Sequence, residues 1–384
     1  MEPQPPLPYD AGASASRTGE RRGRALDVAR AGRYSRAAVR WARLLASRRP
    51  RPGLRVFYGH DRVPAPGEPV AGGTAKFQRL ASRWPNRPTD FTLLYLGSTW
   101  LPRDLRPLLW LARRRGALIV VNQNGVGYPG WAGAEAEAFN RPLRRILSCA
   151  DHVLYQSAFC KRSADELVCA PAASWEILPN AVDVSHFVPT ARSPGAGPVL
   201  LLGGDQYQAY RLELGLRTLA SLLPSHPEAR LLVTGRLAVP AEPLVAELGL
   251  SGRVDVVGRY AQRDAPSVFQ RAHLLLHTKV NDPCPSVVIE AMACGLPVVY
   301  ARSGGVPELV GEDAGIGVPH PDSFDRDEPP SPEAMADAVG SVLGDLPGYA
   351  TRARARAVES FALEPWLDRH AALFDELLRE AGLA

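Results

Sequence analysis

The chain has few of the residues that mark metal centres, disulfide frameworks and membrane spans. Its five cysteines are scattered, with no Cys-x-x-Cys pair, and no histidine cluster supplies the other ligands of a zinc site. The best apolar runs, such as ALIVV and HLLLH, fall short of the roughly 18 residues that cross a bilayer. The N-terminus carries no apolar signal-peptide core. We therefore expect a cytoplasmic protein with reduced thiols and no bound metal.

Lysine is also rare. Of the 45 basic residues only Lys76, Lys161 and Lys279 are lysines, and 40 acidic residues leave a formal charge of +5. Such a mild excess gives no reason to expect a nucleic-acid partner. The chain has no Gly-x-x-x-x-Gly-Lys-Ser/Thr loop, which excludes the common class of nucleoside triphosphatases.

The basic residues gather near the N-terminus. Residues 1–50 indicate a basic, partly disordered extension, because they combine a stretch rich in Pro, Ser, Ala and Gly with a dense run of arginine. Residues 20–51 have two interpretations. They form a solvated extension, or a helix with Trp41 among its apolar contacts that lies on the inner face of an anionic membrane.

Short apolar runs alternate with longer amphipathic stretches from residue 54 onward. A Pro/Gly-rich break at 188–198 interrupts the alternation, which then restarts. Apolar runs that are buried on both faces are typical of parallel sheets. We therefore expect an α/β fold with two Rossmann-like, doubly wound domains, 51–190 and 191–365, facing a cleft. The expected strands are LRVFYG, FTLLYLG, ALIVVNQ, HVLYQS and WEILPNAV in the first domain and VLLLGG, RLLVTG, VDVVG, HLLLHT and LPVVYA in the second.

Glycine pairs follow the first strand of each domain. Gly72 and Gly73 enter a helix, where free backbone amides form an anion-binding corner. Gly203 and Gly204 end the other strand, and Arg211 lies close enough in sequence to reach back to a phosphate. The alternative is that these glycines satisfy only the turn geometry.

A third glycine pattern, NQNGVGYPG at 122–130, contains Gly-x-Gly-x-x-Gly after the strand ALIVV. It suggests an NAD(P)-dependent enzyme as an alternative function. The context argues against this alternative, since the pattern follows the third strand of the domain and includes a proline.

The stretch NDPCPSVVIEAMACGLPVV, 281–299, places two acidic residues eight positions apart around the start of a helix. Asp282 lies beyond the strand HLLLHT, and Glu290 lies one turn inside the helix. The amides of Ser286 and Val287 at the helix start favour a diphosphate. Carboxylates in these positions suit sugar hydroxyls, and a carboxylate within so apolar a run is costly to bury without a partner.

NDPCPSVVIEAMACGLPVVYARSGGVPELV resembles the donor-binding signature of retaining glycosyltransferases of family 4, which have the two-domain GT-B fold. ADHVLYQSAFCKR, ILPNAVDVSHFVP and VDVVGRYAQRDAPSVFQRAHLLLHT precede it in the family's order. The resemblance implies a nucleotide-diphosphate sugar as donor substrate, no cofactor, and an acceptor that the sequence does not identify. It also implies that a final helix, 366–384, crosses back to the N-terminal domain.

The resemblance assigns roles to single residues. Glu290 matches the family's ribose ligand, and Asp282 matches the ligand of the transferred sugar. Gly73 matches the loop that faces the donor phosphates, and Arg259 with Tyr260 matches the loop near the base.

The chain departs from the family pattern at the donor phosphates and the acceptor loop. Asp282 is one methylene shorter than the usual glutamate. Gly204 stands where an arginine is expected, and Arg211 is the best match to the usual lysine. Pro283 and Pro285 leave the amides of Cys284, Ser286 and Val287 as donors, and Asn124 replaces the usual histidine.

These departures do not exclude catalysis. In this fold retaining transfer is thought to use the leaving phosphate as the proton acceptor, so Asn124 is compatible with activity although it carries no proton. The sequence therefore predicts an active sugar transferase. A non-catalytic relative that binds sugar nucleotides is the alternative.

Overall fold

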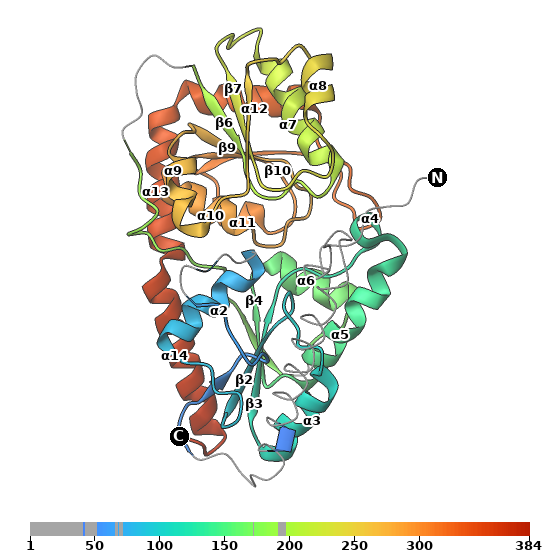
Figure 1. Cartoon of the computed structure of the whole chain (residues 1–384), viewed down its shortest axis with the longest axis vertical. Helices are drawn as coiled ribbons and strands as arrows, with labels where there is room; N and C mark the ends of the chain where they lie inside the picture. The colour runs from blue at the N-terminus through green and yellow to red at the C-terminus, as the bar shows by residue number, and fades with distance from the viewer. Residues whose placement is uncertain (1–40, 43–51, 66–67, 69–71, 172, 191–196) are drawn as a thin grey trace, which may run out of the picture.

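The computed structural model describes residues 41–42, 52–65, 68, 72–171, 173–190 and 197–384. The chain forms two α/β domains that are stacked along the long axis of the molecule (Figure 1). Most of the basic helix considered for residues 20–51 lies outside the described residues; Trp41 and Ala42 are helical. No helix in the described part of the chain is long and apolar enough to cross a membrane.

The first domain is built on a five-stranded parallel sheet with the order β1-β2-β3-β4-β5. The side chains of β1 to β4 are fully buried, because helices cover both faces, whereas the edge strand β5 is largely exposed. The strands are β1 Val56–Phe57, β2 Leu93–Gly97, β3 Leu118–Gln123, β4 His152–Tyr155 and β5 Ser174–Ile177.

The second domain is built on a six-stranded parallel sheet with the order β11-β10-β9-β6-β7-β8. The order reverses between β6 and β9, which creates the switch point where ligands of open α/β sheets bind. The last strand was not among the expected ones, since GIGV has two glycines in four residues and no apolar run. The strands are β6 Val199–Leu202, β7 Arg230–Thr234, β8 Val254–Gly258, β9 Leu274–His277, β10 Val298–Ala301 and β11 Gly315–Val318. The two parallel sheets confirm the expected fold class.

Helices complete two core layers in each domain. In the first domain α2 and α14 cover one face of the sheet, and α3, α5 and α6 cover the other. In the second domain α9, α10, α11 and α13 pack on one face, and α7 and α12 on the other. The helices are α2 Gly72–Arg83, α3 Leu105–Arg115, α4 Pro129–Ala132, α5 Ala136–Cys149, α6 Ala158–Leu167, α7 Ala209–Leu222, α8 Glu242–Glu247, α9 Ala265–Phe269, α10 Ser286–Ala293, α11 Val306–Val310, α12 Pro332–Gly344, α13 Leu346–Phe361 and α14 Leu363–Glu380.

Helix α14 belongs to the core of the first domain although it follows the second domain in sequence. Figure 1 shows α13 and α14 running one after the other along one side of both domains. Trp366, Leu373 and Phe374 are buried against the first sheet. The helix begins at Leu363, three residues before the boundary at 366 that the sequence suggested.

His370 makes a buried polar contact within this apolar interface. Its Nε2 lies 3.1 Å from the Tyr95 hydroxyl, and its Nδ1 lies 2.9 Å from the carbonyl oxygen of Trp366. The side chain is fully buried, and burial lowers its pKa from 6.5 to about 4. His370 is therefore neutral in the folded protein at neutral pH.

The buried histidine makes the stability of the protein depend on pH. As the pH falls below 6.5, the unfolded chain binds a proton at His370. The folded chain binds this proton only when the pH reaches about 4. Stability is therefore lost as the pH falls through this window, by on the order of 3 kcal/mol from this residue. We expect His370→Gln to reduce the slope of unfolding free energy against pH between 6.5 and 4, as measured by urea titration. An unchanged slope would contradict this assignment.

Candidate functional site

The loop between β9 and α10 lies at the switch point of the second sheet. Asn281, which has φ of +52°, is the only described non-glycine residue with positive φ. Its backbone N–H donates to the Ser303 hydroxyl over 2.9 Å, and its side-chain amide donates to the carbonyl oxygen of Ser323, also over 2.9 Å. A non-glycine residue in this conformation persists only where its surroundings hold it, so the position of the next residue, Asp282, is fixed.

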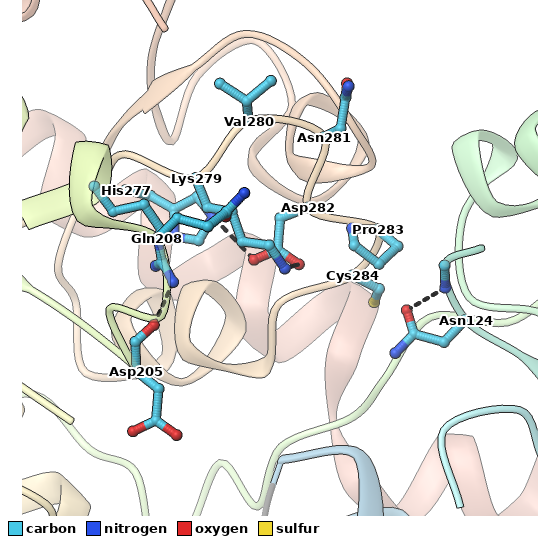
Figure 2. Close-up of polar contacts among 12 residues, drawn as sticks. Asn124, Asp205, Gln208, His277, Lys279, Val280, Asn281, Asp282, Pro283 and Cys284 are labelled. Atoms are coloured by element: carbon cyan, nitrogen blue, oxygen red, sulfur yellow. Dashed lines mark hydrogen bonds and ion pairs between the residues drawn. The ribbon is translucent and has the colours of Figure 1, made fainter. Parts of the chain in front are cut away.

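Asp282 is surrounded by basic side chains. Its two carboxylate oxygens lie 3.3 Å from Nε2 of His277 and 3.3 Å from Nζ of Lys279. Burial opposes ionisation, but Lys279, His277 and Arg211 outweigh it and hold the pKa of Asp282 well below its usual range. Figure 2 shows Asp282 beside Lys279 on the loop. The carboxylate is therefore charged across the physiological pH range.

Arg211, on α7, lies within the same charge cluster. It is 6% exposed, and its guanidinium donates to the carbonyl oxygen of Asp205. Burial lowers the pKa of Arg211, and the charge of Asp282 counteracts that effect. Its Nε has no hydrogen-bond partner in the described part of the chain. The structure thus brings Arg211 and Asp282 together and leaves one arginine donor for a ligand.

The sequence did not predict His277 and Lys279 as site residues. Burial lowers the pKa of His277, so the imidazole is neutral beside Asp282. Lys279 carried a signal, because lysine is so rare in this chain, and a second rare lysine, Lys76, also lies at the domain interface.

The start of α10 meets the glycines that end β6. A Cβ at Gly203 would lie 2.7 Å from Cγ2 of Val287, so only glycine allows this approach. Gly204 has φ of +81°, and its N–H donates to Thr234 over 3.1 Å. Ser286 and Val287 are the first residues of α10, and the cap residue before them supplies no side-chain hydrogen bond. The first N–H groups of a helix have no partner within it, so these amides are available to a ligand.

Glu290 lies further along α10 and is 6% exposed. Its Oε1 accepts a 2.7 Å hydrogen bond from Gln262 and lies 4.0 Å from Arg79 of α2 in the other domain. Burial raises the pKa of Glu290, while Arg79 and Gln262 counteract that rise. Burial raises the pKa of Tyr260, and the charge of Glu290 adds to that rise.

The first domain presents two loops to this site. A Cβ at Gly125 would lie 3.0 Å from Cγ of Pro283, so Asn124 and Gly125 meet the loop of Asp282. Figure 2 shows Asn124 across from Pro283 and Cys284. The N–H of Asn124 donates to Ser98 over 2.9 Å, and its side-chain oxygen accepts from the N–H of Gly125 over 2.7 Å.

Gly72 and Gly73 are the first residues of α2. A Cβ at Gly73 would lie 2.7 Å from Oγ1 of Thr99, in the turn after β2, so a larger residue would push this turn away.

A chain of buried polar side chains lies under these loops, at the carboxyl ends of β3, β4 and β5. Lys76 donates to Oδ1 of Asn122 over 2.7 Å, and Gln156 donates to the same oxygen over 2.6 Å. Asn180 donates to Gln156 over 2.9 Å and to the carbonyl oxygen of Cys284 over 3.0 Å. Burial lowers the pKa of Lys76 to about 8 and raises that of Cys284 to about 12. Cys284 thus has its carbonyl and thiol turned toward the first domain.

The glycines of the dinucleotide-like pattern have packing roles. A Cβ at Gly127 would lie 2.9 Å from the carbonyl oxygen of Ala136, and one at Gly130 would lie 2.9 Å from the backbone of Arg326. The N–H of Gly130 also donates to the carbonyl oxygen of Phe324 over 2.8 Å. The NAD(P) interpretation therefore has no support in the geometry. Among the described residues no group of three or more His, Cys, Asp or Glu side chains could hold a metal ion.

Glu308 joins the two domains. Its carboxylate, on α11, accepts hydrogen bonds of 2.6 and 2.9 Å from the N–H groups of Ala158 and Phe159 at the start of α6. Ser157, the N-cap of α6, donates to the carbonyl oxygen of Pro283 over 2.7 Å. A carboxylate at a helix N-terminus is stabilised by free amides and by the helix dipole. The contact therefore holds the first domain against the loop of Asp282.

Residues 194–356 match the family described as glycosyl transferases group 1. The matched residues cover most of the second domain. Sucrose-phosphate synthase from Thermosynechococcus elongatus is 20% identical and superposes with a TM-score of 0.62. The match covers 79% of this chain and 77% of that chain. Anabaena HepE in complex with UDP-glucose is 19% identical, covers 74% of this chain and 79% of its own, and gives a TM-score of 0.58. Both likenesses support the GT-B fold.

Curated relatives match only in part. The gpi3 subunit of phosphatidylinositol N-acetylglucosaminyltransferase from Schizosaccharomyces pombe is 22% identical over 260 residues, or 66% of this chain and 55% of that protein. The chain spans about half the length of the curated relatives that it matches.

Loss of the Glu308 charge is expected to loosen the domain interface. Glu308→Gln replaces two charge-assisted hydrogen bonds with weaker ones, each worth roughly 1.5–3 kcal/mol when one partner is charged. We expect small-angle X-ray scattering to show a larger radius of gyration for this variant than for the control Glu312→Gln, an exposed residue after α11. Identical scattering from the two variants would show that the hydrogen bonds of Glu308 do not hold the two domains together.

Proposed function

We propose that the protein transfers a sugar from a nucleotide-diphosphate sugar to an acceptor, with retention of configuration and without a metal. The main observation is the position of the two acidic residues around α10. Asp282 lies in the charge cluster before the helix, and Glu290 lies one turn inside it. The free amides of Ser286 and Val287 lie between them. HepE, a structural neighbour, was solved with UDP-glucose, which fits this donor class.

The proposed diphosphate site draws its positive charge from Arg211, Lys279 and the start of α10. Gly204 offers no side chain at the position where an arginine was expected. Lys279, with its ammonium 3.3 Å from the Asp282 carboxylate, is the nearby cation that can take over this role. A lysine ammonium is a compact charge on a flexible stem, so it can leave the carboxylate for a phosphate oxygen. Asp282 is then free to accept hydrogen bonds from the sugar hydroxyls.

The chemistry of the site is compatible with retention. Burial keeps His277 neutral, and Asn124 carries no titratable proton, so neither is a strong base. The leaving phosphate is then the group that accepts the acceptor's proton as the new glycosidic bond forms on the same face of the sugar. Catalysis in this scheme comes from positioning and from stabilising the charge on the departing diphosphate.

A donor screen tests this proposal through Glu290. In a thermal-shift assay with UDP-, GDP- and ADP-sugars, we expect the sugars of one nucleotide to raise the melting temperature of the protein. A ligand stabilises the folded state that binds it. Glu290→Gln removes the charge that would hold the ribose, so we expect affinity for that donor to fall by about tenfold to a hundredfold. Glu242→Gln, on the exposed start of α8, is the matched control.

Two outcomes contradict the proposal. If Glu290→Gln binds and turns over the donor like the control, the carboxylate is not a donor ligand. If the wild-type protein binds a donor but neither hydrolyses nor transfers it across a panel of acceptors, the protein is a non-catalytic sugar-nucleotide binder.

Lys279 gives a second test with a different readout. Lys279→Met is expected to raise the KM for the donor by about tenfold to a hundredfold, because one charge-assisted phosphate contact is lost. It also removes a cation that lowers the pKa of Asp282, so the acid limb of the pH–rate profile should move to higher pH. Lys161→Met, which removes a lysine paired with Asp165 on α6, is the control. An unchanged acid limb would exclude the proposed coupling of Lys279 to Asp282.

A further inference from the structure

A pocket of about 580 Å³ lies in the first domain between α3 and α5, away from the charge cluster of Asp282. Its volume is within the range of roughly 300–1,000 Å³ that is usual for small-molecule sites. Its walls are mostly apolar, and Leu101 and Phe139 are only partly buried there. The lining residues include Ser98, Leu101, Arg103, Arg106, Phe139 and Arg145.

Arginines line this apolar pocket without an acidic side chain among them. Arg103 and Arg106 are exposed, and Arg145 is partly exposed. Within the described residues none of the three has a recorded ion pair or side-chain hydrogen bond. Guanidinium groups bind phosphate through two parallel hydrogen bonds, so the pocket combines a hydrocarbon wall with an anion-binding rim.

The pocket is connected to the proposed acceptor loop. Ser98 lines the pocket and also accepts the 2.9 Å hydrogen bond from the N–H of Asn124. A ligand in the pocket therefore lies next to the loop that meets Pro283 and the donor side of the interface.

Trp41 contacts the start of α3, the helix that forms one wall of the pocket. Its indole N–H donates over 3.1 Å to Asp104, the residue between the pocket residues Arg103 and Leu105. Its ring packs partly buried against the first-domain core. Tryptophan is enriched where apolar and aqueous phases meet, and Trp41 belongs to the basic stretch 20–51. Pocket, arginines and Trp41 thus form one surface with an apolar centre and cationic surroundings.

We infer that this pocket binds a phosphate-bearing membrane lipid, with hydrocarbon against Leu101 and Phe139 and phosphate against Arg103 and Arg106. The lipid is the acceptor or lies beside it, a step that rests on the proposed transferase function. The S. pombe relative is named for a phosphatidylinositol acceptor, which agrees with a lipid phosphate near the reaction loop.

Vesicle sedimentation tests the pocket directly. Full-length protein is expected to sediment with phosphatidylcholine vesicles that contain phosphatidylinositol and much less with phosphatidylcholine alone. Arg103→Gln combined with Arg106→Gln should weaken this binding roughly twentyfold to thirtyfold, since each basic residue near an anionic surface contributes about 1 kcal/mol. Arg87→Gln combined with Arg230→Gln removes the same charge from two other exposed sites and should have little effect. Leu101→Asp should weaken binding because it places a carboxylate in the apolar wall.

Donor binding separates this inference from the proposed function. The arginine and Leu101 variants should keep the thermal shift with the nucleotide sugar selected from UDP-, GDP- and ADP-glucose, whereas Glu290→Gln should lose that shift and still sediment with vesicles. Equal sedimentation of the pocket and control variants would overturn the lipid site and leave the transferase proposal standing. If the control arginine variant loses vesicle binding while Leu101→Asp keeps it, the binding is a general charge effect. This result would also overturn the lipid site.

Discussion

A buried carboxylate must be compensated, and this requirement organises the centre of the molecule. Asp282 is 13% exposed at its side chain and remains charged because His277, Lys279 and Arg211 approach it from β9, the following loop and α7. These three elements come together only at the switch point between β6 and β9. The left-handed backbone at Asn281 and the close approach of Gly203 to Val287 both follow from packing them there.

The same cluster explains which parts of the site the sequence could predict. Asp282, Glu290, Arg211 and the glycine pairs lie in stretches whose order along the chain matches a known pattern, so their general positions followed from the resemblance. Lys279 lies three residues before Asp282, but no periodic pattern indicates where a loop lysine points. The contact of Glu290 with Arg79 joins residues more than two hundred positions apart, and only the packing of the two domains creates it.

The fold was predictable for a related reason. Strands that are buried on both faces have to be continuous apolar runs, and LLLH or VVYA stand out in any sequence. The strand GIGV did not, because its residues are held by pairing with β10 rather than by apolar side chains of their own. The polar residues at the domain junction were likewise unpredictable. Asn122 lies in β3, whereas Gln156 and Asn180 follow β4 and β5, and their shared network appears only once the strands are side by side.

The position of α14 has a consequence for how the protein folds during synthesis. A ribosome releases the strands of the first domain long before it makes the helix that covers one face of their sheet. Until Trp366 and Phe374 emerge, that face has only the cover of α2, so side chains such as Tyr95 and Leu93 lack the packing that α14 provides. The first domain to be synthesised is therefore the last to be completed, and the nascent chain depends on the second domain having already been made.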